Sequence, residues 1–344
     1  MNHGEIPRRF RAVPDRPLAM LRQCPVYQPT PLRLMPDLAE ALGIGALWIK
    51  DETRRMRLGS FKALGGVFAV AQMVEDAART ADLLSEKARE AAAGMTFITA
   101  SAGNHGLSVA AGARIFGARG IIVLCSAVPE GFAKRIRETG SEVLRVDGSY
   151  EDSVRYAIDA ADRNGWLLLA DGSWDGYTER PALVMEGYTV LAEECRSILE
   201  QTGDWPTHVF LQAGVGGLAA AISAHIRDQW PVQPRITIVE PDAAPCLLKS
   251  IETGKLTRAD GPESNMGRLD CKDASLIAFE ALRRDANAFV TVTDEEAEAS
   301  ARLLASHGIS TTPSGAAPLA ALENAGLGAD ARCLLIATEG PETA

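Results

Sequence analysis

One lysine lies in the short apolar stretch LGSFKALGG, residues 58–66. Lys62 follows an aromatic residue, Phe61, and has glycines on both sides. Partial burial lowers the pKa of a lysine, so that a neutral, nucleophilic amine is accessible near pH 7. The stretch therefore indicates a lysine that does amine chemistry, with glycines that let a ligand approach the backbone. The alternative, from this stretch alone, is a lysine that extends its charge to solvent from the start of a helix.

Three further loops with unusual compositions follow expected strands. Short β-rich runs alternate with longer Ala-rich helical stretches, which is typical of an α/β protein with mainly parallel sheets. We expect strands at 46–50, 96–100, 120–125, 141–146, 166–170, 208–213, 235–240, 288–292 and 333–337. The runs at 96–100, 166–170 and 208–213 lead into SAGNHG, DGSW and GVGGL. In open parallel sheets ligands bind beyond the carboxyl ends of strands, so we expect these loops to meet at one pocket.

GVGGL consists of Gly214, Val215, Gly216, Gly217 and Leu218, and it precedes a helical run. Consecutive glycines allow backbone N–H groups to close on a phosphate, and the helix N-terminus adds its positive dipole. A tight turn that needs positive φ is the alternative.

A second interpretation of the same loop is dinucleotide binding. Gly214, Gly216 and Ala219 satisfy GxGxxG/A, and Glu240 ends the next strand, where such folds place a ribose-binding acid. This segment alone fits a nicotinamide-dependent oxidoreductase, but that function leaves Lys62 unexplained.

SAGNHG follows a strand and opens another expected helix. Ser101, Ala102, Gly103 and Asn104 supply small side chains, exposed N–H groups and an amide that can donate to an anionic oxygen. His105 is either a general base or a packed side chain beneath the loop. The loop is therefore expected to bind a carboxylate or a phenolate.

Two other residues have both a chemical and a structural interpretation. Ser314 precedes a small-residue helical run, so it is an N-cap by default; its hydroxyl could also face a heterocycle nitrogen. Asp171 directly follows the run at 166–170, at the ligand-binding edge of its sheet. It is either an N-cap or a catalytic carboxyl whose pKa is raised by partial burial.

Composition excludes several classes of protein. The chain has 344 residues, of which 47% are hydrophobic, enough for two lobes. A net charge of −10 without a basic block argues against nucleic-acid binding. The six cysteines show no zinc-ligand spacing and fit a reducing cytoplasm, and whether Cys246 and Cys271 pair stays open. No apolar run reaches the length of a membrane span, and the N-terminus does not look like a signal peptide.

Together, GSFKALGG, ASAGNHG, AGVGGL and TPSGAA resemble the pyridoxal-phosphate enzymes of the tryptophan-synthase β-like fold, called fold type II. The resemblance implies two open, mainly parallel α/β lobes with the cofactor, pyridoxal 5'-phosphate, between them. It implies that Lys62 forms the Schiff base and that Phe61 packs near the ring. Asn104 would bond the phenolate oxygen, the loop at 214–218 would hold the phosphate, and Ser314 would face the pyridine nitrogen. A lone serine there disfavours a long-lived carbanion and favours elimination.

Longer segments, among them DGSWDGYTERPALVMEGY and IVEPDAAPCLLKS, resemble the diaminopropionate ammonia-lyases. Those enzymes imply α,β-elimination from 2,3-diaminopropionate to pyruvate and ammonia, with Lys62 and Asp171 as catalytic residues. One departure is Ala102, where those lyases have an aspartate associated with the D-isomer; serine and threonine dehydratases share ASAGNHG. We therefore expect L-substrates, with serine, threonine or 3-hydroxyaspartate dehydration as the alternative. A binding protein that kept the pocket without turnover is disfavoured by the intact Lys62, Asn104 and Ser314.

The expected organisation is a small α/β lobe, residues 66–165, inserted into a large cofactor-binding lobe formed by residues 1–65 and 166–344. The fold commonly forms homodimers, so a homodimer that binds a small amino acid is expected. No metal site is expected.

Overall fold

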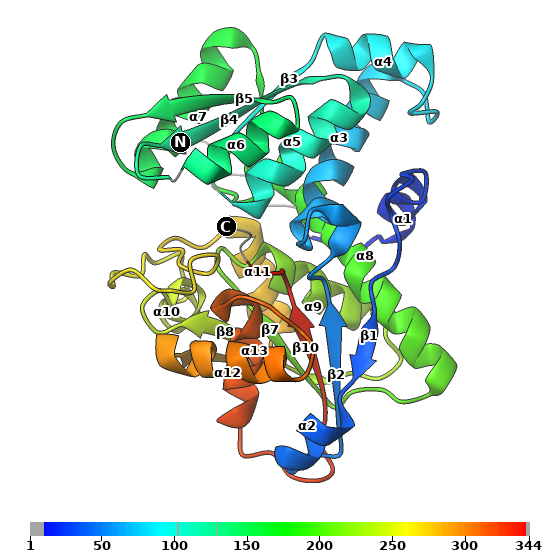
Figure 1. Ribbon diagram of the computed structural model, residues 1–344, viewed down its shortest axis with the longest axis vertical. Coiled ribbons are helices and arrows are strands. Elements are labelled where there is room, and N and C mark those ends of the chain that lie inside the picture. The colour runs from blue at the N-terminus through cyan, green and yellow to red at the C-terminus, as the bar shows by residue number, and fades with distance from the viewer. Residues whose placement is uncertain (1–9, 102, 129, 342–344) are drawn as a thin grey trace.

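Two β-sheets organise the computed structural model, which describes residues 10–101, 103–128 and 130–341. Figure 1 shows the four-stranded sheet and its helices at the upper end of the long axis and the six-stranded sheet at the lower end. The strands of the larger sheet, in spatial order, are β1 (Leu32–Leu34), β2 (Ala46–Asp51), β10 (Arg332–Ala337), β7 (His208–Gln212), β8 (Arg235–Pro241) and β9 (Ala288–Val292). Those of the smaller sheet are β5 (Glu142–Val146), β4 (Arg119–Cys125), β3 (Thr96–Ala100) and β6 (Leu167–Leu168).

The expected α/β class with mainly parallel sheets is confirmed. Within the described strands, all pairings are parallel except that of β1 with β2. Each of the nine expected runs contains a strand, but the run at 166–170 pairs only over Leu167–Leu168. The three-residue β1 was not expected because LRL is too short to show a two-residue period.

Helices cover the sheets and connect them. Their bounds are α1 (Asp15–Leu21), α2 (Pro36–Ala41), α3 (Lys62–Ala78), α4 (Glu86–Ala93), α5 (Asn104–Phe116), α6 (Glu130–Glu138), α7 (Tyr150–Asn164), α8 (Glu179–Thr202), α9 (Gly217–Gln229), α10 (Cys246–Thr253), α11 (Leu276–Asp285), α12 (Asp294–Ser306) and α13 (Pro313–Glu323). A 3-10 turn, η1, spans Arg55–Arg57. The lobe boundaries at 65/66 and 165/166 stay a prediction. The prediction assigns β6 to the large lobe, whereas this strand pairs with β3 of the smaller sheet.

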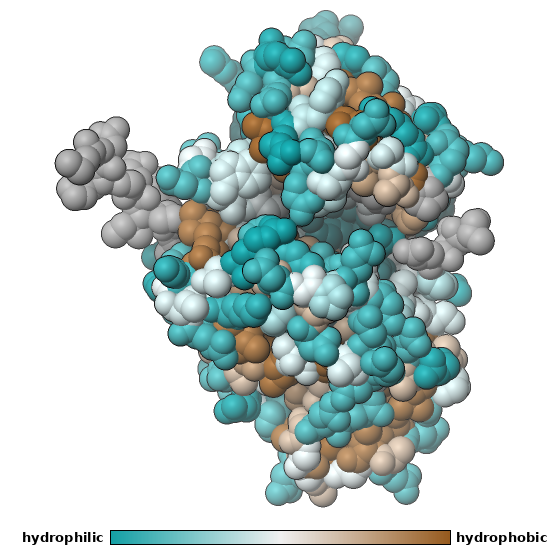
Figure 2. Space-filling model, turned by 90° about the vertical axis from the view of Figure 1, so that its left-hand side faces the viewer, coloured by the Kyte–Doolittle hydropathy of each residue, from teal (hydrophilic) through white to brown (hydrophobic). Residues whose placement is uncertain are grey.

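No helix in the described ranges combines the length and apolar character that crossing a bilayer requires. On the face shown in Figure 2, hydrophilic residues cover most of the surface and hydrophobic residues are scattered among them in small groups.

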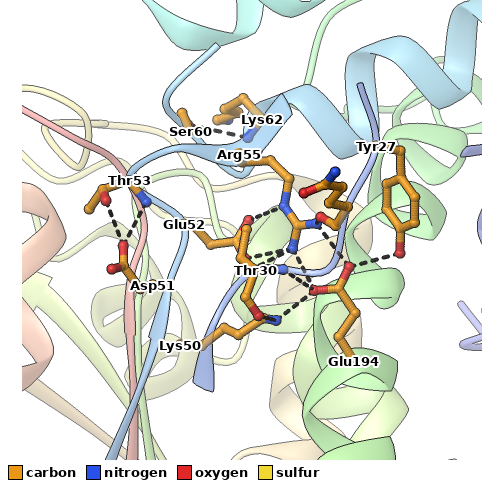
Figure 3. Close-up of polar contacts among 11 residues, drawn as sticks. Tyr27, Thr30, Lys50, Asp51, Glu52, Thr53, Arg55, Ser60, Lys62 and Glu194 are labelled. Atoms are coloured by element: carbon orange, nitrogen blue, oxygen red, sulfur yellow. Dashed lines mark hydrogen bonds and ion pairs between the residues drawn. The ribbon is translucent and has the colours of Figure 1, made fainter. Parts of the chain in front are cut away.

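A buried group of four charged side chains fixes the segment that leads to Lys62 (Figure 3). The Arg55 guanidinium donates from Nε to Glu52 Oε2 at 2.6 Å and from Nη2 to Glu194 Oε2 at 2.7 Å. Lys50 Nζ donates to the same Glu194 oxygen at 2.5 Å and to the Thr30 carbonyl at 2.7 Å. Two cations therefore meet two anions, so the buried group is neutral overall.

This group, which we call the Arg55 cluster, joins three separated parts of the chain. Lys50 and Glu52 lie at the end of β2 and just after it, Glu194 lies on α8, and Tyr27 donates its hydroxyl to Glu194 Oε1 at 2.8 Å. Buried charges are tolerated only when they are paired and hydrogen-bonded, as they are here. The cluster fixes the exit of β2 to α8 just before the chain turns into α3.

Close contacts between helices explain two of the glycines after Lys62. A Cβ at Gly65 would lie 2.6 Å from the Val184 carbonyl of α8 and would collide with the Tyr188 ring. A Cβ at Gly66 would collide with Ser108 of α5. The expectation that these glycines let a ligand approach the backbone is therefore wrong: they let α3 pack closely against α8 and α5.

Replacing Gly65 with alanine is expected to destabilise the fold by about 1–3 kcal/mol, because neither the Val184 carbonyl nor the enclosed Tyr188 ring can move freely. Gly131 is the control, since it lies in α6 with no described atom within 4 Å of an added Cβ. Gly131→Ala should be neutral or stabilising by about 0.5–1 kcal/mol. Urea unfolding of both variants measures the difference, and equal effects would contradict the packing argument.

Glu194→Gln is expected to destabilise the protein by about 3–5 kcal/mol, because it leaves Lys50 and Arg55 with one buried anion between them. The control is Glu200→Gln on the same helix, where the Glu200 side chain is 60% exposed and pairs with Arg196. That change should cost less than about 1 kcal/mol. Thermal unfolding monitored by circular dichroism compares the two, and a Glu194→Gln midpoint close to that of the control would argue against the Arg55 cluster as a structural anchor.

Candidate active site

Lys62 and Asp171 form an ion pair between the two sheets. Lys62 is the first residue of α3, with Phe61 as the N-cap, and Asp171 follows β6 of the smaller sheet. Lys62 Nζ donates to Asp171 Oδ2, and the two side chains are 22% and 24% exposed. The structure therefore brings together the two residues that were predicted to be catalytic, although they are separated by 109 positions.

The pKa values of this pair correct two expectations. Burial is the largest effect on Lys62 and lowers its pKa, but the charge and hydrogen bond of Asp171 outweigh it, so the net pKa is raised. Burial likewise raises the pKa of Asp171, but the Lys62 ammonium outweighs that effect and the net pKa is lowered. The prediction of a readily neutral Lys62 is therefore wrong for this arrangement, and so is the prediction of a raised pKa for Asp171, because each residue stabilises the charge of the other.

Two aromatic rings border Lys62. Its Nζ lies 5.4 Å from the centroid of the Phe61 ring and 5.8 Å from that of Tyr188, and the two rings meet edge to face at 4.9 Å. The Tyr188 hydroxyl is buried with no hydrogen-bond partner among the described residues. Tyr188 was missed in the sequence because it lies inside the long helix α8, where no local pattern distinguishes it from a core tyrosine.

The glycine loop at 214–218 lies at the N-terminus of α9. Gly216 has φ +98°, and a Cβ at Gly214 would lie 2.9 Å from Cys271 Sγ, so these two positions require glycine. A Cβ at Gly217 would lie 3.8 Å from the Asp171 carbonyl and 3.9 Å from the Tyr188 ring, which places the loop beside the Lys62 pair. The first N–H groups of α9 have no intrahelical acceptors, so the donors of this loop fit a phosphate.

The remaining residues of the loop have structural contacts. Leu218 is buried in the hydrophobic core. The Val215 carbonyl accepts the Ser275 N–H at 2.9 Å, and Val215 also lines a cavity of about 300 Å³.

Glu240 does not fit the dinucleotide interpretation. It is fully buried, and its two oxygens accept the N–H groups of Leu247 and Leu248 at 2.7 and 2.8 Å, in the first turn of α10. Burial raises the pKa of Glu240 to about 7, against the opposing effect of those two donors. Both carboxylate oxygens of Glu240 are therefore occupied by hydrogen bonds inside the protein, so Glu240 does not form a ribose site.

The SAGNHG loop opens α5, with Gly103 as the N-cap. Ser101 Oγ accepts the Gly103 N–H at 3.2 Å, and the Asn104 amide nitrogen donates to a carboxylate oxygen of Glu339. Ala102 lies outside the described residues.

His105 lies beneath this loop. It is buried, and its Nε2 lies 2.8 Å from the Leu169 carbonyl. Burial is the largest effect on its pKa and lowers it, which favours the neutral ring. The structure thus supplies a packing role for His105 through a bond to the chain just before Asp171, and its role toward a substrate stays a prediction.

Ser314 is buried one position inside α13, so its expected role as an N-cap is wrong. The N-cap is Thr312, whose Oγ1 accepts the Gly315 N–H at 3.2 Å. Ser314 Oγ instead accepts the Arg268 N–H at 3.1 Å. Asp171 is not an N-cap either, since the next helix, α8, begins at Glu179.

Two charged residues near Ser314 and Asn104 were not singled out in the sequence. Arg268 Nε lies 3.7 Å from Glu339 Oε2, and Arg268 Nη1 would lie 3.3 Å from a Cβ at Gly103. Glu339 follows β10, so the rule that ligands bind beyond the carboxyl ends of strands could have found it. Arg268 lies in an irregular segment that gives no such signal.

The six cysteines are free thiols, so Cys246 and Cys271 are not paired. Within the described ranges no group of histidine, cysteine and acidic side chains has the arrangement of a metal site.

Comparison with known proteins indicates which kind of reaction this site supports. A family model described as "Pyridoxal-phosphate dependent enzyme" matches residues 24–339. The diaminopropionate ammonia-lyase of Escherichia coli K12 is 34% identical over 337 residues, which cover 91% of this chain and 85% of that protein.

Solved structures agree with this match. The crystal structure of the Escherichia coli diaminopropionate ammonia lyase in complex with D-serine superposes with a TM-score of 0.86 at 31% identity and covers 98% of this chain and 91% of that one. Its complex with an aminoacrylate–PLP azomethine reaction intermediate gives a TM-score of 0.85 at 32% identity, with the same coverage.

Asp171→Asn is expected to lower the pKa of Lys62, because burial then acts without the opposing carboxylate. The rate at which Lys62 of the apoprotein reacts with an amine-selective reagent should reach its half-maximum at a lower pH, by about one unit or more. Mass spectrometry of the peptide that contains residue 62 measures this rate. Asp175→Asn, an exposed position on the same loop, is the control, and an unchanged Lys62 profile in Asp171→Asn would contradict the pairing.

Proposed function

Because the chain belongs to the family of pyridoxal-phosphate dependent enzymes, we propose that it is an ammonia-lyase that converts 2,3-diaminopropionate to pyruvate and ammonia. The observation that carries this proposal is the ion pair of Lys62 with Asp171, beside a glycine loop at the N-terminus of α9. It combines an amine, a carboxyl group and a set of phosphate donors at one place. Similarity to the diaminopropionate ammonia-lyases supports the choice of substrate.

Different residues of the site would bind different parts of the cofactor. Pyridoxal phosphate supplies an electron sink for the charge left on the α-carbon of an amino acid when its proton is removed. Lys62 would link to the cofactor covalently, with Phe61 packed near its ring. The N–H groups of 214–218 would bind the phosphate, Asn104 would donate to the phenolate oxygen, and Ser314 would face the ring nitrogen. These backbone and side-chain groups fit pyridoxal phosphate because they match its anionic oxygens and its ring nitrogen.

Proton transfer follows from the coupling of Lys62 and Asp171. While Lys62 is an ammonium, its charge holds the pKa of Asp171 low. When the ammonium passes its proton to Asp171, Lys62 becomes a neutral base and Asp171 a carboxylic acid, a form that the burial of Asp171 favours. Lys62 can then accept the α-proton of the substrate while Asp171 protonates the departing β-amine. One residue pair thus supplies both the base and the acid.

The SAGNHG loop would bind the substrate carboxylate through Ser101, Ala102, Gly103 and His105, with the N-terminus of α5 adding its dipole. We propose L-substrates, since Ala102 stands where the lyases of this resemblance have the aspartate associated with the D-isomer. The same residue favours a second candidate function, dehydration of serine, threonine or 3-hydroxyaspartate. Free, scattered thiols support a cytoplasmic enzyme, and the fold-type resemblance supports a homodimer.

The products distinguish these substrates. We expect the purified yellow enzyme to release two ammonia per pyruvate from L-2,3-diaminopropionate, and at least about ten times more slowly from the D-isomer, a difference of about 1.4 kcal/mol or more. The panel includes serine, threonine and 3-hydroxyaspartate, each of which would release one ammonia per keto acid. A higher kcat/KM for a hydroxy amino acid than for the diamine would reject the substrate proposal in favour of the dehydratase.

Lys62→Ala is expected to abolish the cofactor adduct that borohydride reduces and to lower kcat by about three orders of magnitude or more. Lys62→Arg keeps the charge opposite Asp171 without a condensing amine, so it should be equally inactive but better folded. Absorbance before and after borohydride treatment measures the adduct. An adduct that persists in Lys62→Ala would place the covalent link elsewhere.

A further inference from the structure

Glu339 occupies a junction between three elements of the site. It follows β10 by two residues and is buried, with 3% of its surface exposed. Its backbone forms a bridge with Ser60, and the Phe61 N–H donates to the carbonyl of Thr338 at 3.1 Å. Glu339 is therefore fixed against the turn that precedes Lys62.

The side chain of Glu339 connects the other two elements. One carboxylate oxygen accepts a hydrogen bond from the Asn104 amide nitrogen at the start of α5. The other accepts the Thr312 hydroxyl at 2.7 Å, at the N-cap of α13 and two residues before Ser314. Asn104, which is proposed to contact the cofactor's oxygen, and the start of the helix that carries Ser314 thus meet at one carboxyl group.

The Arg268 guanidinium supports an ionised Glu339. Its Nε lies 3.7 Å from Glu339 Oε2, and its backbone N–H donates to Ser314 Oγ. A cation at this distance from a buried carboxyl group favours the charged form. Both Glu339 oxygens accept hydrogen bonds, and an ionised carboxylate has no proton to donate, so Glu339 acts as an acceptor toward Asn104.

An acceptor-only partner decides which way an amide faces. The Asn104 side chain has a donating nitrogen and an accepting oxygen of nearly the same size, so a neutral environment allows either orientation. Glu339 accepts only the orientation with the nitrogen toward it. The second N–H of that nitrogen then remains available to an anionic oxygen of the cofactor.

We propose that Glu339 is a positioning residue that fixes the amide orientation of Asn104, so that Asn104 donates to the phenolate oxygen of the cofactor. This inference rests on the proposed function, since it assumes the cofactor at Lys62. Glutamine at position 339 could donate as well as accept, so the Asn104 amide could invert and turn its oxygen toward the phenolate. That inversion would replace an attraction by a repulsion at the cofactor.

The experiment compares the absorption spectra of the purified holoenzymes of wild type, Glu339→Gln, Asn104→Ala and the double variant across pH. Wild type must first show the borohydride-reducible adduct; without it the proposed function fails, irrespective of Glu339. Given that adduct, Glu339→Gln should keep it but shift the visible band in the same direction as Asn104→Ala, with kcat/KM about 10-fold lower. In the Asn104→Ala background the same change should have little further effect on the spectrum.

A purely structural role for Glu339 would lower the thermal midpoint without changing the spectrum of the folded enzyme. A wild-type spectrum in Glu339→Gln, or spectral shifts that add in the double variant, would overturn the proposal. The control is Glu323→Gln: Glu323 is an exposed carboxylate at the end of α13 that accepts a hydrogen bond from Ser300, and it sets the baseline for removing a carboxylate charge near this helix. If Glu339→Gln does not fold, Glu339→Asp replaces it: it keeps the charge but withdraws the oxygens by one methylene, and an unchanged spectrum would again overturn the proposal.

Discussion

The ion pair of Lys62 and Asp171 is the constraint around which the site is built. One partner enters from the larger sheet through the end of β2, and the other leaves the smaller sheet at the end of β6. Electrostatic attraction is strong at this partly buried place because little water screens it. The pair therefore joins the segment after β2 to the segment after β6 and also shifts the pKa values of the groups expected to do the chemistry.

The surroundings of the pair are arranged to keep it in place. Tyr188 fills the space between Gly65 of α3 and Gly217 of α9, so the helix that carries Lys62 and the glycine loop are spaced by one ring. The Arg55 cluster attaches the same helix, α8, to the exit of β2. Tyr188 and Glu194 of α8 thus help to place Lys62, because α8 contacts both the first turns of α3 and the end of β2.

The sequence predicted the parts of the site whose signals are local. Lys62, Asn104, Asp171 and the loop at 214–218 each lie at a strand end or a helix start, where composition changes abruptly. Tyr188 and Arg268 lie in a helix interior and an irregular segment, so only tertiary contacts identify them. For Glu240 the local pattern was misleading. It matched the pattern of a ribose-binding acid, but both of its oxygens accept hydrogen bonds from N–H groups in the first turn of α10.

The direction of the pKa shifts was mistaken for a similar reason. Burial alone predicts a neutral lysine and a protonated aspartic acid, and each residue considered singly in its sequence has only burial to act on it. The two side chains come from positions 109 residues apart, and their mutual attraction reverses both shifts. The reversal has a chemical consequence: while both groups are charged, Lys62 has no lone pair to act as a base and Asp171 has no proton to act as an acid. Transfer of the Lys62 proton to Asp171 changes both at once. Reactivity therefore depends on moving a proton within the pair: the Lys62 ammonium gives its proton to Asp171, and the lysine is then free to accept one from a substrate.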